Sequence, residues 1–329
     1  MPLTTVAPAR HPRSCRIISA LVTAATVAAA GCGGKASAAG PVTPEKPDIV
    51  IGAPPAVSSA ALFIAQDDGL FQKAGLHVKI EALGAASPAL PELLRGQVDV
   101  LEYPWTAVIK AEAAAAARLH AIAAAQSLGP RLDEILVLRD SGIAAAAQLR
   151  GKTIGVPSLG GLDTVLVDSV LADYGIGPAQ VRLVPVGAQA MGSALATHRV
   201  DAIEPGGLLV TRIEEELGAV SLVDLDQGAT LGFPLAGYVV TDRFLARFPR
   251  TAAALSRALD QANAIASTDL GAVQRAVTQS AHVSPAVAAV TALGTFPVNV
   301  DPVQLQRVAG LMLQYHELSQ PFNVTGLTG

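Results

Sequence analysis

The side chains that could bind a ligand or carry out chemistry stand in short loops after predicted strands. Ser58 and Ser59 belong to the first loop, and Tyr103, Trp105 and Thr106 belong to another. The other candidates are Ala86, Ser87, Ser158, Gly160, Asp163, Thr164, Gln189 and Glu204. In open α/β sheets, ligands bind beyond the carboxyl ends of the strands, where helix N-termini point free N–H groups outward. We therefore predict that these residues bind one ligand.

Several acidic and aromatic residues have a structural explanation beside the functional one. Trp105, the only tryptophan, either contacts the ligand or seals the core of a lobe. Glu204 either binds the ligand, caps a helix or bridges two lobes. Asp163 falls in the first turn of a predicted helix, where the helix dipole stabilises a carboxylate without a ligand. Asp99 and Asp201 are expected to fix the turn into a strand.

Catalytic motifs are incomplete throughout the sequence. The "GKT" tail of a phosphate-binding loop has Ala146 in place of the first glycine, and Gly155 stands one residue too far from Ser158 for a nucleophile elbow. "HELSQ" from His316 lacks the second histidine of a zinc motif, and "YGIGPAQ" has Gln180 in place of the third glycine of a dinucleotide loop. We predict no catalytic residue, no cofactor and no metal.

The strands and helices expected to position these loops occur in two similar copies along the sequence. "QVDVLEY" from Gln97 is echoed about a hundred residues later by "RVDAIEP" from Arg199. "IGAP" returns as "IGVP", and "VKIEAL" faces "VRLVPV", in the same order and at nearly the same spacing. The repetition predicts two similar lobes whose loops form the two walls of one cleft.

Alternating strand and helix patterns predict an α/β fold with a mostly parallel sheet in each lobe. Glu134 to Arg139 and Leu235 to Thr241 are expected to be strands that cross between the lobes and act as a hinge. The predicted divisions are residues 48–133 as the first part of lobe one, 134–239 as lobe two with the crossing strands, and 240–329 as the return to lobe one with carboxy-terminal helices.

The amino terminus has the pattern of an export signal. Three arginines precede a short apolar segment, and "AAGC" ends at Cys32. Residues 1–32 are predicted to be a lipoprotein signal peptide with lipidation at Cys32, because a lone exported cysteine at a cleavage site has no disulfide partner. An ordinary signal peptide cut at an Ala-x-Ala site is the alternative. Residues 33–47 are small, polar and proline-bearing, which indicates a flexible tether.

Composition narrows the class of partner. The net charge is −4 at pH 7, whereas a nucleic-acid partner normally calls for a basic surface. Half of the chain is apolar by composition, at 51%, but no segment after the signal offers the roughly 20 apolar residues of a membrane span. We expect a soluble, exported body that does not bind nucleic acid.

The chain resembles ABC-transporter solute-binding proteins of the sulfonate, taurine, nitrate and thiamine-precursor group. "ALFIAQDDGLFQKAGLHVKIEAL" is similar to that group's "A-x-x-x-G-L-F-x-x-x-G-L-x-V" segment, and "LLRGQVDV", "AQLRGKTIGVP" and "ALATHRVDAIEP" resemble its next segments. The likeness extends to the segment starting at Asp301. It implies a two-lobed type II periplasmic-binding-protein fold that closes on a small organic solute and presents it to an ABC permease with its ATPase subunit.

The resemblance implies a monomer, held by its lipid anchor at the outer face of the cytoplasmic membrane or free in the periplasm. An exported enzyme on the same fold and a ligand-sensing lipoprotein are the alternatives. Sulfonate-binding relatives tend to have a serine-rich loop where this chain has "SLGGLDT". Because the expected cleft loops contain Asp163 but no Lys or Arg, and Glu102 and Glu204 flank them, we predict a neutral, zwitterionic or cationic ligand.

Overall fold

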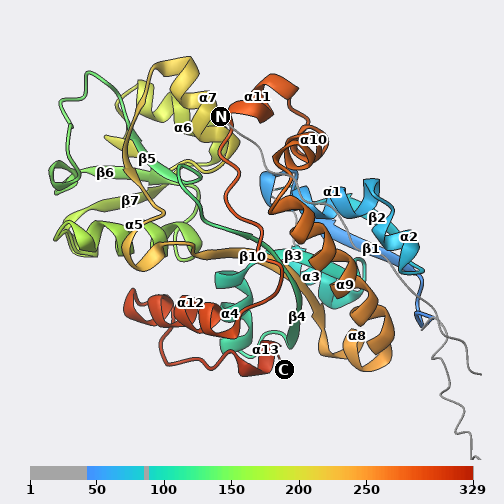
Figure 1. The fold of residues 1–329 in the computed structure, drawn as a ribbon. Helices are drawn as coiled ribbons and strands as arrows, with labels where there is room; N and C mark the ends of the chain where they lie inside the picture. Colours follow the sequence, from blue (N-terminus) through green and yellow to red (C-terminus); the bar gives the residue numbers. More distant parts are fainter. Residues whose placement is uncertain (1–42, 85–88, 329) are drawn as a thin grey trace, which may run out of the picture. The chain divides into compact units, whose positions relative to one another are not determined.

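The strands of the protein form two five-stranded sheets (Figure 1). The computed structural model describes residues 43–84 and 89–328. The strands of the first sheet are β1 Asp48–Ala53, β2 His77–Ala82, β3 Val100–Pro104, β4 Leu119–Ser127 and β10 Pro234–Thr241. Those of the second are β5 Glu134–Val137, β6 Thr153–Val156, β7 Arg182–Pro185, β8 Ala202–Ile203 and β9 Val220–Asp224. We call the parts built on these sheets lobe 1 and lobe 2.

Helices cover both sheets, and short 3₁₀ turns connect several elements. Those that follow the strands of lobe 1 are η1 Val57–Ser59, α1 Ala60–Asp67, α2 Leu70–Lys73, α3 Ala89–Arg95, α4 Trp105–Ala113, α8 Asp242–Arg247, α9 Pro249–Ala266, α10 Leu270–Ser280 and α11 Pro285–Val290. Lobe 2 has η2 Ala146–Leu149, α5 Leu162–Asp173, η3 Pro178–Gln180, α6 Ala188–Ala196, α7 Leu208–Leu217 and η4 Gly228–Thr230. The chain ends with α12 Pro302–Gln314 and α13 Thr325–Thr328.

The two sheets have equivalent strand orders, β2-β1-β3-β10-β4 and β7-β6-β8-β5-β9. β1 pairs in parallel with β2 and β3, as β6 does with β7 and β8. The fourth strand of each sheet runs antiparallel to its neighbours: β10 in lobe 1 and β5 in lobe 2. This confirms the prediction of two similar α/β lobes.

The antiparallel strand of each lobe directly follows a crossing of the chain from the other lobe. β5 follows β4 along the chain yet belongs to lobe 2, and β10 follows β9 yet belongs to lobe 1. The strands expected at Glu134 to Arg139 and Leu235 to Thr241 therefore lie inside the sheets. The chain passes between the lobes just before them, in residues 128–133 and 225–233.

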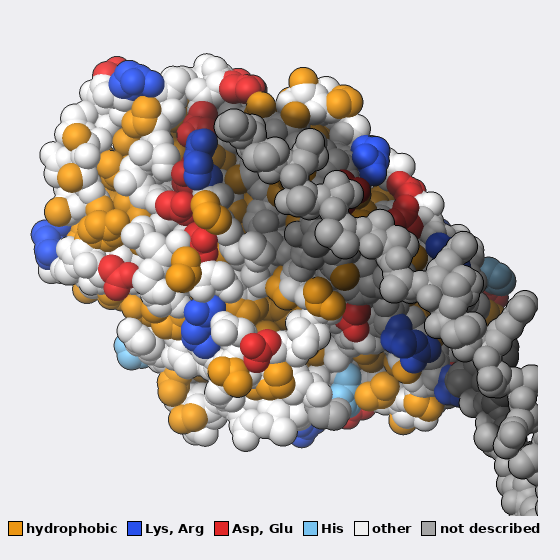
Figure 2. Space-filling model, in the orientation of Figure 1, with side chains coloured by type: hydrophobic (Ala, Val, Ile, Leu, Met, Phe, Trp, Pro, Cys, Tyr) orange, Lys and Arg blue, Asp and Glu red, His pale blue; other side chains and the backbone are white. Residues whose placement is uncertain are grey.

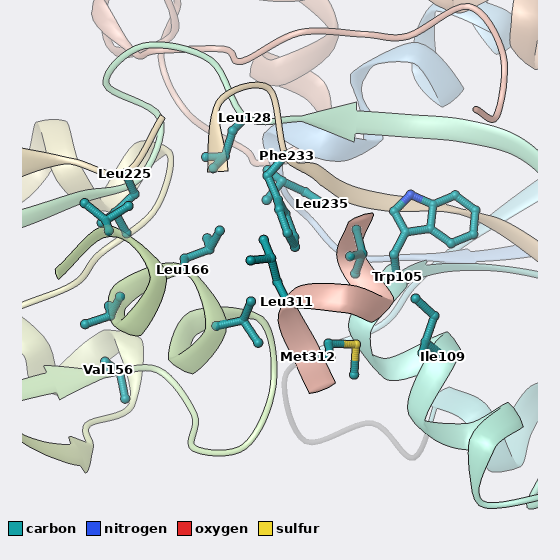
Figure 3. Close-up of a cluster of buried hydrophobic side chains, with 14 of the residues drawn as sticks. Trp105, Ile109, Leu128, Val156, Leu166, Leu225, Phe233, Leu235, Leu311 and Met312 are labelled. Atoms are coloured by element: carbon teal, nitrogen blue, oxygen red, sulfur yellow. The ribbon is translucent and has the colours of Figure 1, made fainter. Parts of the chain in front are cut away.

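Helix α12 packs against both lobes (Figure 3). Leu311 lies toward Leu166 of α5 in lobe 2, whereas Met312 lies toward Ile109 of α4 in lobe 1. All four side chains are buried. Helix α12 thus joins the hydrophobic cores of the two lobes.

Candidate functional site

Matching aspartates anchor the strands that lead to the site. Asp99 precedes β3 and accepts a hydrogen bond from the backbone N–H of Val50 in β1, with a separation of 3.0 Å between Oδ2 and N. Asp201 precedes β8 and accepts the equivalent bond from Thr153 in β6 at 2.8 Å. Each carboxylate holds the start of one strand against its neighbour, so the loops that follow reach the same edge of the sheet. This agrees with the structural role predicted for both aspartates.

The loops at this edge enclose a cavity of about 480 Å³ between the lobes. Lobe 1 contributes Pro54 to Ser58 and the end of β3, and lobe 2 contributes Pro157 and the Gly206 to Leu209 segment. Leu132 and Leu235, next to the crossings, line the same cavity. Its size falls in the range of sites for small molecules. We call it the interlobe cavity.

Glu102 of β3 is the buried acid on the lobe 1 side of the interlobe cavity, with 4% of its surface exposed. Ser59 Oγ lies 2.8 Å from Glu102 Oε2 and 2.7 Å from the carbonyl oxygen of Pro54. A hydroxyl has one hydrogen and a carbonyl oxygen only accepts, so both contacts are satisfied when Ser59 donates to Pro54 and a protonated Glu102 donates to Ser59. Burial raises the pKa of Glu102 to about 7, in agreement with this arrangement.

Three carboxyl groups influence one another on the lobe 2 side. Asp133 lines the interlobe cavity, and burial, with the charges of Asp163 and Asp224, raises its pKa to about 7. Burial first, and then the charges of Asp163 and Asp133, raise the pKa of Glu204 well above its usual value. Gly206 carries no side chain where a Cβ atom would overlap the Asp133 carboxyl group. The lobe 2 wall is therefore acidic, as is Glu102 opposite it.

Contacts between the lobes close the structure near the interlobe cavity. Lys110 Nζ of α4 donates to the carbonyl oxygen of Gly160 in lobe 2 at 2.6 Å. The same ammonium group donates to Glu317 Oε2, beyond α12, at 2.7 Å. Elsewhere α11 contacts α7, and Val57 lies near Gly207. Lys110 thus links lobe 1, lobe 2 and the carboxy-terminal segment.

The surface carries charges of both signs. Acidic and basic side chains are interspersed with apolar ones on the face that Figure 2 shows.

Among residues 43–84 and 89–328, no helix is long and apolar enough to cross a membrane. Within the same residues, no group of three or more His, Cys, Asp or Glu side chains could hold a metal ion.

Two of the predicted ligand-binding residues, Ser58 and Tyr103, line the interlobe cavity. Ser59 stands behind it, bonded to Glu102. Trp105 is buried and lines a different cavity, and Thr106 is buried in α4. Ala86, Ser87 and Cys32 lie outside the described residues.

The candidates of lobe 2 mostly bond to one another. Ser158 donates to Asp163 through both its backbone N–H and its hydroxyl group, at 3.0 and 2.7 Å. The backbone N–H of Gly160 donates to Thr164 Oγ1 at 3.0 Å. Gln189 is exposed, and Glu204 is buried without lining the interlobe cavity. The ligand contacts of all these residues stay predictions.

Sequence reasoning left Gln126 and Asp133 out of the site, although both line the interlobe cavity. Gln126 is the last residue but one of the alanine-rich strand β4, and Asp133 precedes β5, so both stand beside the crossings and not in the repeated loops. Ser59 occupies the N-cap of α1 but caps no N–H group, because its hydroxyl group contacts Pro54 and Glu102. Gly161 holds the N-cap position of α5.

The sequence matches one protein family and one curated relative. A family model described as "NMT1/THI5 like" matches residues 56–269. A "putative thiamine biosynthesis protein" of Haemophilus influenzae is 30% identical over 145 residues, which is 44% of this chain and 44% of the relative. The match thus spans less than half the length of that curated relative.

Solved structures share the fold. The alkanesulfonate-binding protein SsuA from Xanthomonas axonopodis pv. citri, bound to MOPS, aligns with a TM-score of 0.69 and 21% identity, covering 87% of this chain and 99% of its own. The desulfurization enzyme DSZB aligns with a TM-score of 0.64 and 17% identity, covering 85% and 96%. The fold therefore occurs in both a binding protein and an enzyme.

Proposed function

Because the chain belongs to the NMT1/THI5-like family and has the type II periplasmic binding protein fold, we propose that it is the extracytoplasmic solute-binding protein of an ABC importer. The observation that carries this proposal is the cavity of about 480 Å³ enclosed between two lobes that two chain crossings join. Small dihedral changes in such crossings allow lobes to close on a ligand as rigid bodies. The closed protein would then deliver a small organic solute to a permease with its ATPase subunit.

The charge of the interlobe cavity favours an amine or an electron-poor heterocycle. Glu102 and Asp133 line it, whereas no Lys, Arg or His is among the described residues that do so. An amine would pair with the carboxylates, and Tyr103 offers an aromatic face for a cation–π contact worth about 0.5–2 kcal/mol. SsuA was solved with MOPS, which carries a sulfonate group, bound to it; we propose that the present protein prefers an amine to a sulfonate.

Calorimetric titration tests this ligand class. We expect benzylamine or 4-aminopyrimidine to bind saturably to the purified protein, and ethanesulfonate and nitrate, which are simple anions, not to bind. The variant Ala188→Phe, which places a ring where Ala188 lines the interlobe cavity, should lose the binding. Saturable binding of ethanesulfonate or nitrate, with neither amine binding, would overturn the ligand class and leave the receptor role standing.

Hinge closure can be measured separately by solution scattering. A saturating ligand should reduce the radius of gyration slightly, because the lobes rotate toward each other. Native mass spectrometry of the same sample should show a monomer, and protein purified without added ligand should reveal any molecule that copurifies. Identical scattering profiles with and without a proven ligand would contradict closure.

We further propose that Cys32, outside the described residues, carries the lipid that holds the protein at the membrane. Each buried methylene group contributes about 0.8 kcal/mol, so two or more acyl chains give stable anchoring where one does not. The variant Cys32→Ser should lose incorporation of labelled fatty acid and normal processing, while Cys15→Ser should keep both. Unchanged labelling of Cys32→Ser would refute the anchor.

An exported enzyme is the alternative function, and one observation favours it: DSZB, a desulfurization enzyme, has the same fold. The two functions differ in turnover. An activity screen on the purified protein with amines and heterocycles should find binding without product. Conversion of any bound compound would favour the enzyme.

A further inference from the structure

A second cavity of about 390 Å³ lies next to the interlobe cavity, at the start of β10. Pro234 lines this second cavity, whereas the next residues of β10, Leu235 and Ala236, line the interlobe cavity. Gln126, near the end of β4, borders both. The adjoining parts of β4 and β10 therefore form the wall between the two cavities. We call the second one the hinge cavity.

The hinge cavity combines apolar surfaces with uncharged polar groups. Trp105, Pro234, Pro297 and Leu305 supply the apolar surface, and its polar side chains include those of Ser127, Gln126, Asn299 and Gln304. Asp301 is the only charged residue among its described lining residues, and its Oδ1 atom accepts from the N–H groups of Val303 and Gln304 at 2.8 and 3.4 Å as the N-cap of α12. The cavity therefore suits an uncharged ligand.

Three polar groups at this cavity belong to largely buried residues and have unused hydrogen-bonding capacity among the described residues. The indole N–H of Trp105, which is 1% exposed, has no hydrogen-bond partner there. Gln126 gives its amide N–H to the carbonyl oxygen of Leu293 at 2.9 Å, which leaves its side-chain oxygen without a partner. The hydroxyl group of Ser127, a residue 5% exposed, is also unpartnered. Each of these groups is therefore free to form a hydrogen bond with a molecule that occupies the cavity.

The indole is held in a fixed position by strand β10. A Cβ atom at Gly237 of β10 would lie 2.5 Å from Cη2 of Trp105, so the ring packs directly against the backbone of that strand. Figure 3 shows the indole nitrogen on the side of the ring that faces the strands near Leu235. A ligand beside this ring would therefore meet a fixed aromatic surface and not a mobile side chain.

We propose that the hinge cavity is a second ligand site, separate from the interlobe cavity, for an uncharged single-ring aromatic carboxamide. The carbonyl oxygen of such a ligand accepts from the Trp105 indole, and its NH₂ group donates to Gln126 and Ser127. Its ring packs against Pro234, Pro297 and Leu305. The volume of about 390 Å³ accommodates a molecule of this size. The proposal does not depend on which ligand the interlobe cavity binds.

Fluorescence titration with benzamide tests the proposal, because Trp105 is the sole tryptophan. We expect a saturable change in emission at a concentration on the order of 0.1–1 mM, as suits a small fragment. Gln304→Phe, which fills the hinge cavity, should weaken binding at least about tenfold, and Ser127→Ala, which removes one acceptor without adding bulk, several-fold. The matched control Ala188→Phe fills the interlobe cavity and should change the affinity less than about twofold.

The same titrations can overturn the proposal. The absence of a saturable change in the wild-type protein would do so, as would unchanged affinity in both Gln304→Phe and Ser127→Ala. Loss of binding in Ala188→Phe would place benzamide in the interlobe cavity and refute a separate site. Thermal unfolding of each variant shows that it is folded. Ser127→Ala keeps the test decisive if Gln304→Phe does not fold.

Discussion

Raising the pH from 6 to 8 should strengthen the binding of a cation in the interlobe cavity. Burial raises the pKa of Glu102 to about 7, and burial with nearby carboxylates raises the pKa of Asp133 to about 7. A carboxyl group with such a pKa is about one-tenth ionised at pH 6 and about nine-tenths ionised at pH 8. Because a cation gains from the ionised form, each group contributes about tenfold in affinity, and the pair at most about a hundredfold.

Calorimetric titration with benzylamine, which stays protonated over this range, measures the effect. The wild-type affinity should rise steeply with pH, and Glu102→Gln should retain only the part that depends on Asp133, about tenfold. Benzyl alcohol, which has the same ring without the charge, is the control ligand and should show little pH dependence. An affinity for benzylamine that is constant or falls between pH 6 and 8 would refute the reasoning about the two acids.

Three further predictions concern closure, packing and stability. Lys110→Met removes the hydrogen bond to lobe 2, so calorimetry should show about two- to fivefold weaker binding of the interlobe ligand. Lys79→Met, on exposed β2, is the control and should have no effect. Equal affinities of the two variants would contradict a role of Lys110 in closure. Gly237→Ala would push a methyl group into the indole ring of Trp105 and should lower the free energy of unfolding by about 1–3 kcal/mol. Gly310→Ala, in open space on α12, should raise it by about 0.5–1 kcal/mol. Urea unfolding measures both changes, and an unchanged free energy in Gly237→Ala would show that strand β10 can move. Folding raises the pKa of Glu102 from 4.5 to about 7, so its contribution to the unfolding free energy is present below pH 4.5 and is lost as the pH rises through 7. Glu102→Gln should therefore lose less stability than the wild type between pH 5 and pH 8. Parallel curves of unfolding free energy against pH for the two proteins would speak against the raised pKa.

The repeat in the sequence predicted the two lobes because each copy carries the same structural contacts. The Val-Asp pairs became equivalent anchors, with Asp99 bonded to β1 and Asp201 bonded to β6. The partners of the crossing strands could not be predicted, because an apolar run such as that of β10 fits the interior of either sheet. Only the tertiary pairing assigns β5 to lobe 2 and β10 to lobe 1.

The candidate site was harder to predict than the fold. Loops at the ends of repeated strands correctly indicated the edge where the interlobe cavity lies, and Ser58 and Tyr103 line it. Equivalent positions differ in burial, however: Glu102 borders the interlobe cavity and Glu204 does not. Sequence spacing places a residue at a strand end but does not tell which neighbour covers it, so Gln126 and Asp133 were missed. Trp105 was grouped with the residues of the interlobe cavity, whereas it lines the hinge cavity.

The exchange of β5 and β10 has a consequence for the order of folding. The strands of lobe 2 are contiguous in sequence, from β5 to β9, so its sheet can be completed from one stretch of chain. Lobe 1 must wait for β10, whose pairing with β4 closes a loop of about a hundred residues. Once lobe 2 has formed, its two ends lie side by side and the entropy cost of that closure falls. Lobe 2 should therefore fold first and act as the template on which lobe 1 is completed.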